Sequence, residues 1–477
     1  MSSKDHTNIL ALNRRTVLKG AAGAAAASAL PATIAQASTS KTGSYAKRRQ
    51  DGEPIKLVYF NARGGEAAER ALVERYMEEN PNIEIEYLST TAIGGPSDTD
   101  TIANLIFNIQ ADTTIDVSKV EVQRTPLELM SIDAALPLSQ INEEAVQARV
   151  DQLLNTNTTA IKGDVWGLPY EYDPFGYIYN ADMYVEAGLD PDKPPKTWDE
   201  FRRVNEALQA EFPDAWTICH PLKNLNKIQP LVWSAGGWYW EGGVPPTRAN
   251  VTNEGTVAAY KFFDEWAQNG WLNSEEISTD QSIQHMVARQ CAAINLSTTT
   301  VLLYQANAPE TDFRVARYPT RDESFDPVNF AGGSALVVPS TSANPEAALD
   351  FILWLTSEET QRLKYGVEGD LGISEQDLFD QDLPTNIAVA EVLADDPTWS
   401  EAMATFDIPT RPAGGLSPVY SRAYDVYASM QERIALTDVD VLSELEAAEA
   451  DVQALIDENM EQLPALYEGS DDATPIA

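Results

Sequence analysis

The stretch that decides the fold runs from residue 165 to residue 201 and reads VWGLPYEYDPFGYIYNADMYVEAGLDPDKPPKTWDEF. Residues 177–180 form the end of a β-strand, and residues 182–187 form a short helix that Gly188 ends. Thr197 is an N-cap residue for a second helix, and Glu200, three residues later, completes a capping box. The stretch therefore predicts a strand and two helices in close succession.

Strand and helix signals alternate from residue 55 onward. Residues 55–60 form an apolar strand, a helix follows with apolar residues at helical spacing as far as Tyr76, and Pro81 ends it. Residues 83–87 alternate as a second strand. This order is typical of the start of a parallel α/β sheet. Further elements are expected as helices at 257–266, 345–356 and 441–460 and as a strand at 335–338.

The N-terminal 37 residues carry an export signal. Arg14-Arg15 begins a twin-arginine motif, a small-residue apolar run covers 20–34, and Ala35-Gln36-Ala37 supplies a cleavage site. We expect the mature chain to start near Ser38, without a lipid anchor there because no cysteine lies near the cut. Residues 38–53 are expected to form a flexible leader and residues 461–477 an acidic tail.

Length and charge limit the function classes. A chain of 477 residues is too long for one ordinary core, so two lobes are expected. The net charge is −40, and loss of residues 1–37, which hold four basic residues and one acidic residue, makes it about −43. Such a surface repels nucleic acid and anionic lipid. Because salt screens the self-repulsion, a saline, halophilic setting is expected.

Few residues are available for catalysis. Only His220 and His285 remain after cleavage, and both are interpreted as surface histidines. Neither a phosphate-binding loop nor a dinucleotide fingerprint is present. We expect no cofactor and no metal site, although 73 acidic residues leave a hydrolytic carboxylate pair open. Cys219 and Cys291 either pair as a disulfide or act as small buried residues.

Aromatic residues point to carbohydrate. Ten tryptophans are present, and Trp238-Tyr239-Trp240 follows the flexible turn Gly236-Gly237. Sugar rings stack on such side chains, whereas carboxylates and amides bind their hydroxyls. Core packing explains this cluster equally well.

The 166–201 block resembles extracellular solute-binding protein family 1, the maltose-type binding proteins of ABC importers. Shared features are a Gly-Leu-Pro segment, a strand ending Tyr-Asn, an Ala-Gly-Leu helix end and a Pro-x-Thr-Trp helix start. Segments 234–237, 286–294 and 332–348 are similar more loosely. The resemblance implies a non-catalytic α/β protein with the two-lobed periplasmic-binding-protein fold (type II-like), in which discontinuous lobes meet at a hinge and an interlobe ligand cleft.

Carried over by position, the resemblance implies lobe 1 at 54–170 plus 296–330 and lobe 2 at 171–295 plus 331–460, with a first hinge crossing at 169–172. It implies nine candidate ligand-binding residues, of which Asp173 is favoured: Asp173, Asn61, Arg63, Glu121, Trp238, Thr298, Gly332, Tyr420 and Arg411. Ser297-Thr298-Thr299 stands where related sugar binders often carry tryptophan, which argues against a long stacked oligosaccharide.

The leading hypothesis is a monomeric extracytoplasmic receptor that binds a sugar or polyol and delivers it to ABC permease subunits after export by the twin-arginine machinery. One alternative is a receptor for a phosphorylated polyol or other osmolyte, which Arg63 or Arg411 in the cleft would suit. The other is a secreted carbohydrate-active enzyme.

Overall fold

The computed structural model describes residues 54–89, 105, 108–109, 114–122, 125–156, 159–161, 163–241, 246–411 and 419–459. The expected export signal, leader and acidic tail lie outside these residues. Among the helices of the described residues, none combines the length and apolarity needed to cross a membrane.

The elements follow one another from strand to helix as the sequence predicts. Up to the longest strand they are β1 (Ile55–Asn61), α2 (Glu66–Glu79), β2 (Ile83–Ser89), β3 (Val117–Glu121), α5 (Thr125–Ser131), β4 (Ala135–Leu136), α6 (Leu138–Ile141), α7 (Glu143–Val150), β5 (Ala160–Ile161), β6 (Asp164–Val165) and β7 (Leu168–Asn180). Those that follow are α8 (Ala181–Glu186), α9 (Trp198–Glu211), the 3-10 helix η4 (Leu225–Lys227), α10 (Gln229–Trp233), β8 (Trp240–Glu241), β9 (Arg248–Ala249), α11 (Glu254–Gln268), α12 (Thr279–Val287), β10 (Ala293–Ser297), α13 (Thr300–Asn307) and β11 (Phe313–Ala316). The remainder are β12 (Asn329–Pro339), α14 (Pro345–Leu355), α15 (Glu358–Lys364), α16 (Glu375–Phe379), β13 (Leu383–Pro384), α17 (Ile387–Ala394), β14 (Thr410–Arg411), α18 (Tyr420–Leu436) and α19 (Val441–Asn459).

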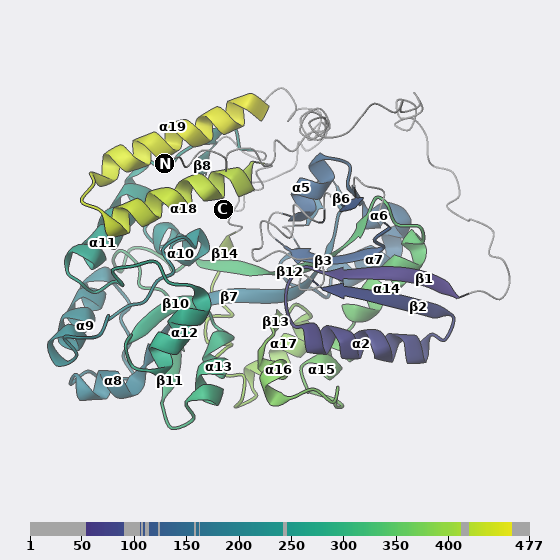
Figure 1. Ribbon diagram of the computed structural model, residues 1–477, viewed down its shortest axis with the longest axis horizontal. Helices are drawn as coiled ribbons and strands as arrows, with labels where there is room; N and C mark the ends of the chain where they lie inside the picture. Colours follow the sequence, from purple (N-terminus) through teal and green to yellow (C-terminus); the bar gives the residue numbers. More distant parts are fainter. Residues whose placement is uncertain are drawn as a thin grey trace, which may run out of the picture.

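One curled mixed sheet runs through the molecule in the order β10-β7-β12-β3-β1-β2. β1 pairs in parallel with β2 and β3, whereas β12 is antiparallel to both β3 and β7. In Figure 1, β7 and β12 cross the middle of the molecule and join the group of β1, β2 and α2 to the group of α9, α11 and α18. The expected α/β, two-lobed fold class is therefore confirmed.

β7 belongs to both groups. Its residues 168–171 pair with residues 334–336 of β12, and its residues 175–180 pair with β10 and β11. Between them, Asp173 lies opposite Gly332 and Tyr172 opposite Gly333. The strand passes from one group to the other at about residues 172–174, next to the crossing expected at 169–172.

The packing differs from the expected lobe bounds in two segments. Leu336 and Phe351 share a core with Leu57 and Leu72, so β12 and α14 pack with the first group of elements. Val301 and Phe313 share a core with Ile178 in the second half of β7. The cause is the antiparallel pairing of β12 with β3, which carries α14 back over the first group. We propose revised bounds of 54–170 plus about 334–366 for lobe 1, with most of 173–330 and 419–459 in lobe 2.

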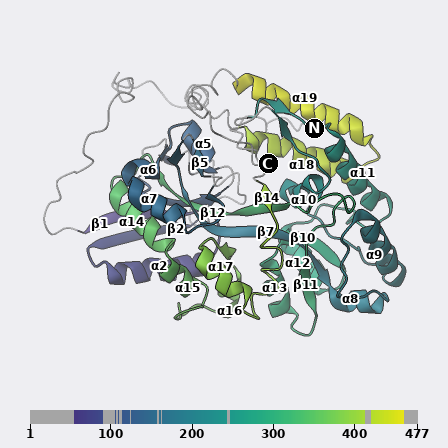
Figure 2. The ribbon, with the colours of Figure 1, turned by 180° about the vertical axis from the view of Figure 1, so that it is seen from behind.

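The segment that contains α15, α16 and α17 lies where the two groups meet (Figures 1 and 2). Within it, β13 pairs with Tyr172 and Glu171 of β7. The Gln361 side chain donates a hydrogen bond to the Tyr170 carbonyl at 2.9 Å. This segment therefore braces the crossing point from one side.

Thr197 caps α9 as predicted, since its hydroxyl accepts from the Glu200 amide. The expected capping box is wrong in its second half. The Glu200 carboxylate accepts from the Lys196 amide at 2.7 Å instead of from the amide of Thr197.

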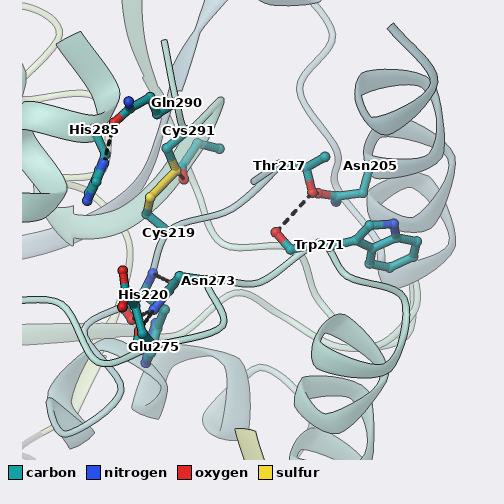
Figure 3. The surroundings of a disulfide bond; sticks show 11 residues. Asn205, Thr217, Cys219, His220, Trp271, Asn273, Glu275, His285, Gln290 and Cys291 are labelled. Atoms are coloured by element: carbon teal, nitrogen blue, oxygen red, sulfur yellow. Dashed lines mark hydrogen bonds between the residues drawn. A yellow bond between two sulfur atoms is a disulfide. The ribbon is translucent and has the colours of Figure 1, made fainter. Parts of the chain in front are cut away.

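Cys219 and Cys291 form a disulfide, which ties the chain after α9 to the segment entering β10 (Figure 3).

His220, the residue after Cys219, is fully buried, so its interpretation as a surface histidine is wrong. Its ring packs on Phe263, and its Nε2 lies 3.1 Å from the Gln431 amide of α18. Burial lowers the pKa of His220 to about 3. His285 is half-buried and contacts Gln290.

Candidate ligand site

Asp173 lies at the crossing point of β7 and is only 9% exposed. Its Oδ1 is buried and has no hydrogen-bond partner among the residues that the structure describes. Gly332, its cross-strand neighbour, makes room for this carboxylate: a Cβ at that position would lie 3.2 Å from Asp173 Oδ2 and 2.8 Å from Phe330 Cε1. Because buried acceptors are normally satisfied, the free Oδ1 indicates a position that a donor on a ligand can fill.

Charged groups of both signs surround Asp173. Burial raises the pKa of Asp173 to about 6, and Ser297, Arg63 and Lys227 oppose that increase. Lys227 ends η4, and its burial lowers the pKa of its ammonium to about 7, against the attraction of Asp173. Asp382, just before β13, also has a pKa raised well above its ordinary value, first by burial and then by Asp173. Two carboxylates and two cations thus converge on the crossing point.

An aromatic wall, consisting of Phe330, Trp233 and Trp238, adjoins the carboxylate. The Phe330 and Trp233 rings are stacked with centroids 6.4 Å apart, and the Trp233 and Trp238 centroids are 5.6 Å apart. Trp238 is half-buried, whereas Tyr239 and Trp240 are core residues. Of the Trp238–Trp240 cluster, only the first side chain can therefore offer a ring face to a ligand.

A buried charge cluster, consisting of Glu69, Lys119, Glu171 and Lys364, lies on the lobe 1 side of Asp173. Lys364 Nζ lies 2.6 Å from Glu171 and 3.1 Å from Glu69, and Lys119 Nζ lies 2.9 Å and 3.2 Å from the same two carboxylates. All four side chains are at most 4% exposed. The cluster is electrically balanced, and it holds the pKa of Glu171 at about 2 because both ammonium groups outweigh the burial.

The buried charge cluster contacts the two backbone segments that carry Arg63 and Asp173. Lys119 Nζ donates to the Gly64 carbonyl at 3.2 Å, in the loop that carries Arg63. Glu171 precedes Asp173 by two residues in β7 and accepts from the Ser334 hydroxyl at 2.8 Å. These contacts fix the positions of Arg63 and Asp173 relative to each other.

Five of the nine predicted residues come together: Asp173, Gly332, Arg63, Trp238 and Arg411. Four others are occupied elsewhere. Asn61 shapes its own loop by donating to the Gly64 carbonyl and the Tyr87 hydroxyl. Thr298 donates to the Ala402 carbonyl at 2.6 Å, and Tyr420, buried at the start of α18, donates to Asn226. Glu121 lies at the end of β3, opposite Ser334.

Lys227, Asp382 and the buried charge cluster were not predicted from the sequence. A usable signal exists for the cluster, because Lys119 and Glu171 are charged residues inside strands in which most residues are uncharged. No comparable pattern marks Lys227 or Asp382, whose proximity to Asp173 comes from the tertiary fold.

Residues 61–362 match the model of the bacterial extracellular solute-binding protein family. The chain belongs to this family. Its members are transport binding proteins that act outside the cytoplasm, so the family inferred from the 166–201 block is confirmed.

Similar solute-binding proteins differ in what they bind. A maltooligosaccharide ABC transporter solute-binding lipoprotein of Streptococcus pneumoniae is 22% identical over 46% of this chain and 51% of its own length. The chain spans about half the length of the curated relatives it matches first. Among solved structures, UgpB of Mycobacterium tuberculosis in complex with glycerophosphocholine has a TM-score of 0.70 at 19% identity, covering 85% of this chain and 99% of that one. A Thermotoga lettingae protein bound with α-D-tagatose has a TM-score of 0.69 at 20% identity, covering 85% and 100%.

Proposed function

We propose that this protein is the receptor of an ABC importer, which binds a sugar or polyol at Asp173 and hands it to the membrane permease. The observation that carries the proposal is the unpartnered Oδ1 of a carboxylate buried where the two lobes meet. A hydroxyl donor from a ligand would satisfy it, and the half-buried Trp238 supplies an apolar face for ring carbons. Sugar and glycerophosphodiester ligands of the similar proteins support this class.

The groups around Asp173 also limit the size of the ligand. The Thr298 hydroxyl donates to the Ala402 carbonyl at 2.6 Å, and neither Ser297 nor Thr298 has a ring on which a sugar could stack. Within the described ranges, Trp238 is the one half-buried tryptophan that adjoins the carboxylate. A small ligand of one or two rings fits these groups better than a long oligosaccharide.

The two lobes should close on a ligand by a hinge motion about the shared strands β7 and β12. Next to Asp173, residues 172–174 of β7 and 331–333 of β12 connect the two groups of elements. A ligand that contacts Asp173 on the shared strand, Arg63 on lobe 1 and Trp238 on lobe 2 stabilises the closed arrangement, since those contacts coexist only there.

The N-terminal segment and the acidic composition bear on where the protein acts. We propose that residues 1–37 direct a monomer through the twin-arginine pathway into a saline compartment. Replacing Arg14-Arg15 with lysines should keep the protein in the cytoplasm, whereas unchanged export would overturn that route.

The function is tested by titration calorimetry of the mature chain at molar KCl against sugars and polyols. Saturable binding to at least one of them is expected, and Asp173→Asn should weaken it at least about tenfold, because a charge-assisted hydrogen bond contributes about 1.5–3 kcal/mol. Asp199→Asn is the control, since Asp199 is exposed. If no compound binds, and if reducing sugars are instead released from an oligosaccharide, the enzyme alternative replaces the proposal.

A further inference from the structure

Arg411 has no carboxylate partner among the described residues of this strongly acidic protein. Within the described part of the chain it makes no hydrogen bond and no ion pair, although it is half-buried. Burial alone lowers the pKa of its guanidinium. By contrast, Arg202 and Arg314 pair with carboxylates at 2.7 and 2.6 Å. The sequence has 73 acidic residues, yet none of the described ones pairs with this guanidinium. Because a charged group that is partly removed from water needs a counter-ion, a bound ligand is the expected source of one.

Strand geometry places Arg411 on the same face of the sheet as Asp173. Arg411 is the register partner of Phe330, and Gly332 is the partner of Asp173. Phe330 and Gly332 are two residues apart in β12, so all four residues point to one face. Thr410 and Tyr172 alternate with Arg411 and Asp173 along their strands, so their side chains lie on the opposite face of the sheet.

The spacing between the two residues suits a small solute. β7 and β14 flank β12 on opposite sides, and the two positions differ by two residues along it. With strands about 4.8 Å apart and a rise of about 3.3 Å per residue, their Cα atoms are roughly 12 Å apart. Their side chains lie on the same face, on either side of Phe330 in β12.

The aromatic wall continues to Arg411. Its guanidinium carbon lies 5.4 Å from the centre of the Trp238 ring. Trp238 contacts Trp233, which stacks on Phe330. The wall therefore has a carboxylate at one end and a guanidinium at the other, and the Trp238 stack holds the planar guanidinium in a fixed orientation.

We infer that Arg411, held on Trp238, is a subsite for an anionic group, so that the solute is a polyol or sugar bearing a phosphate or carboxylate. This inference rests on the proposed receptor function. The hydroxyls of the solute would reach Asp173, and its acidic group would accept two parallel hydrogen bonds from the guanidinium. Such a group supplies the counter-charge that none of the described residues provides to Arg411.

Titration calorimetry of the mature protein at molar KCl against matched pairs tests this inference. The pairs are glycerol with glycerol 3-phosphate, glucose with glucose 1-phosphate, and glucose with glucuronate, so phosphate and carboxylate are distinguished. The acidic member of at least one pair should bind at least about tenfold more tightly than the neutral one. Arg411→Gln should abolish that preference, and Arg411→Lys should restore part of it.

Arg149→Gln is the matched control, because Arg149 on α7 is also half-buried with a pKa lowered by burial. It should leave the preference unchanged. Equal binding of both members, unaltered by Arg411→Gln, would overturn the anionic subsite and leave the receptor function intact. A uniform loss of affinity for both members in Arg411→Gln would also overturn it, since Arg411 would then act in closing the lobes. No binding of any compound would count against the receptor function itself.

Discussion

The ammonium group of Lys364 lies 2.6 Å from the carboxylate of Glu171, and both side chains are buried next to the strand crossing. Lys364 comes from α15 and Glu171 from β7, so the contact joins the bracing segment to the shared strand. The Lys364 ammonium also lies 3.9 Å from the centre of the Tyr170 ring. A buried pair of this kind stabilises the fold only as a complete set, because either charge alone would be left without compensation.

Lys364→Met should therefore lower the free energy of unfolding by about 3–5 kcal/mol, since it leaves Glu69 and Glu171 with one ammonium group between them. Denaturant unfolding at fixed high salt measures this change. Lys193→Met is the control, because Lys193 pairs with Asp190 at the surface with 79% of its side chain exposed. A loss in Lys364→Met no greater than that in the control would contradict the role given to the buried charge cluster.

His220 should make the fold sensitive to acid. Its pKa is about 3 in the folded protein and about 6.5 when unfolded, so between these values the unfolded chain binds the extra proton. Stability is therefore lost as the pH falls from about 6.5 toward 3, by roughly 3–5 kcal/mol for this group. In His220→Gln the fall in unfolding free energy between pH 7 and pH 4 should be smaller than in the wild type, whereas His285→Gln should follow the wild type. Parallel curves for wild type and His220→Gln would refute this prediction.

The ionised carboxylate of Asp173 should lower the free energy of unfolding, although it supports ligand binding. Its folded pKa of about 6 is above its unfolded value, so the folded protein holds the extra proton and stability falls as the pH rises through about 4 to 6. Asp173→Asn removes the buried charge and should raise the free energy of unfolding above pH 6 by about 1–3 kcal/mol, with the gain vanishing below about pH 4. Thermal unfolding across that range measures the difference. A variant less stable than the wild type at pH 8 would indicate a structural role instead.

Gly332 and Gly333 should respond differently to alanine. A Cβ at Gly332 meets the edge of Phe330 and the Asp173 carboxylate, so Gly332→Ala should weaken ligand binding while the protein still folds. Gly333 has a φ of 112°, and its Cβ would lie 2.0 Å from the Glu171 carbonyl oxygen, so Gly333→Ala should prevent native folding. Calorimetry and circular dichroism of both variants check this pair, and an undiminished affinity in Gly332→Ala would show that the position is remote from the ligand.

Many helices and strands can be predicted from the sequence, because the residues that begin and end them are close together in the chain. Short stretches of neighbouring residues determine three of these elements: the strand that ends at Asn180, the short helix before Gly188 and the N-cap at Thr197. The lobe bounds could not be predicted, because the antiparallel pairing of β12 with β3 joins segments distant in sequence.

The candidate site was predicted in part for the same reason. Asp173 and Gly332 lie in the segments of the family resemblance, and their pairing confirms that they are neighbours. Lys227 lies in a 3-10 helix and Asp382 before a two-residue strand, and neither element carries a periodic signal. His220 follows a cysteine whose disulfide draws it into the core, which the polar character of the residue does not reveal.

Native mass spectrometry of the mature protein, purified in parallel as wild type and Asp173→Asn, tests whether Asp173 holds a sugar or polyol. The wild type should carry a bound solute, which after release has the mass of a sugar or polyol or of its acidic derivative. The Asp173→Asn variant should carry much less of it. Equal retention of the solute by both proteins, or a retained solute of another chemical class, would contradict a sugar or polyol receptor centred on Asp173.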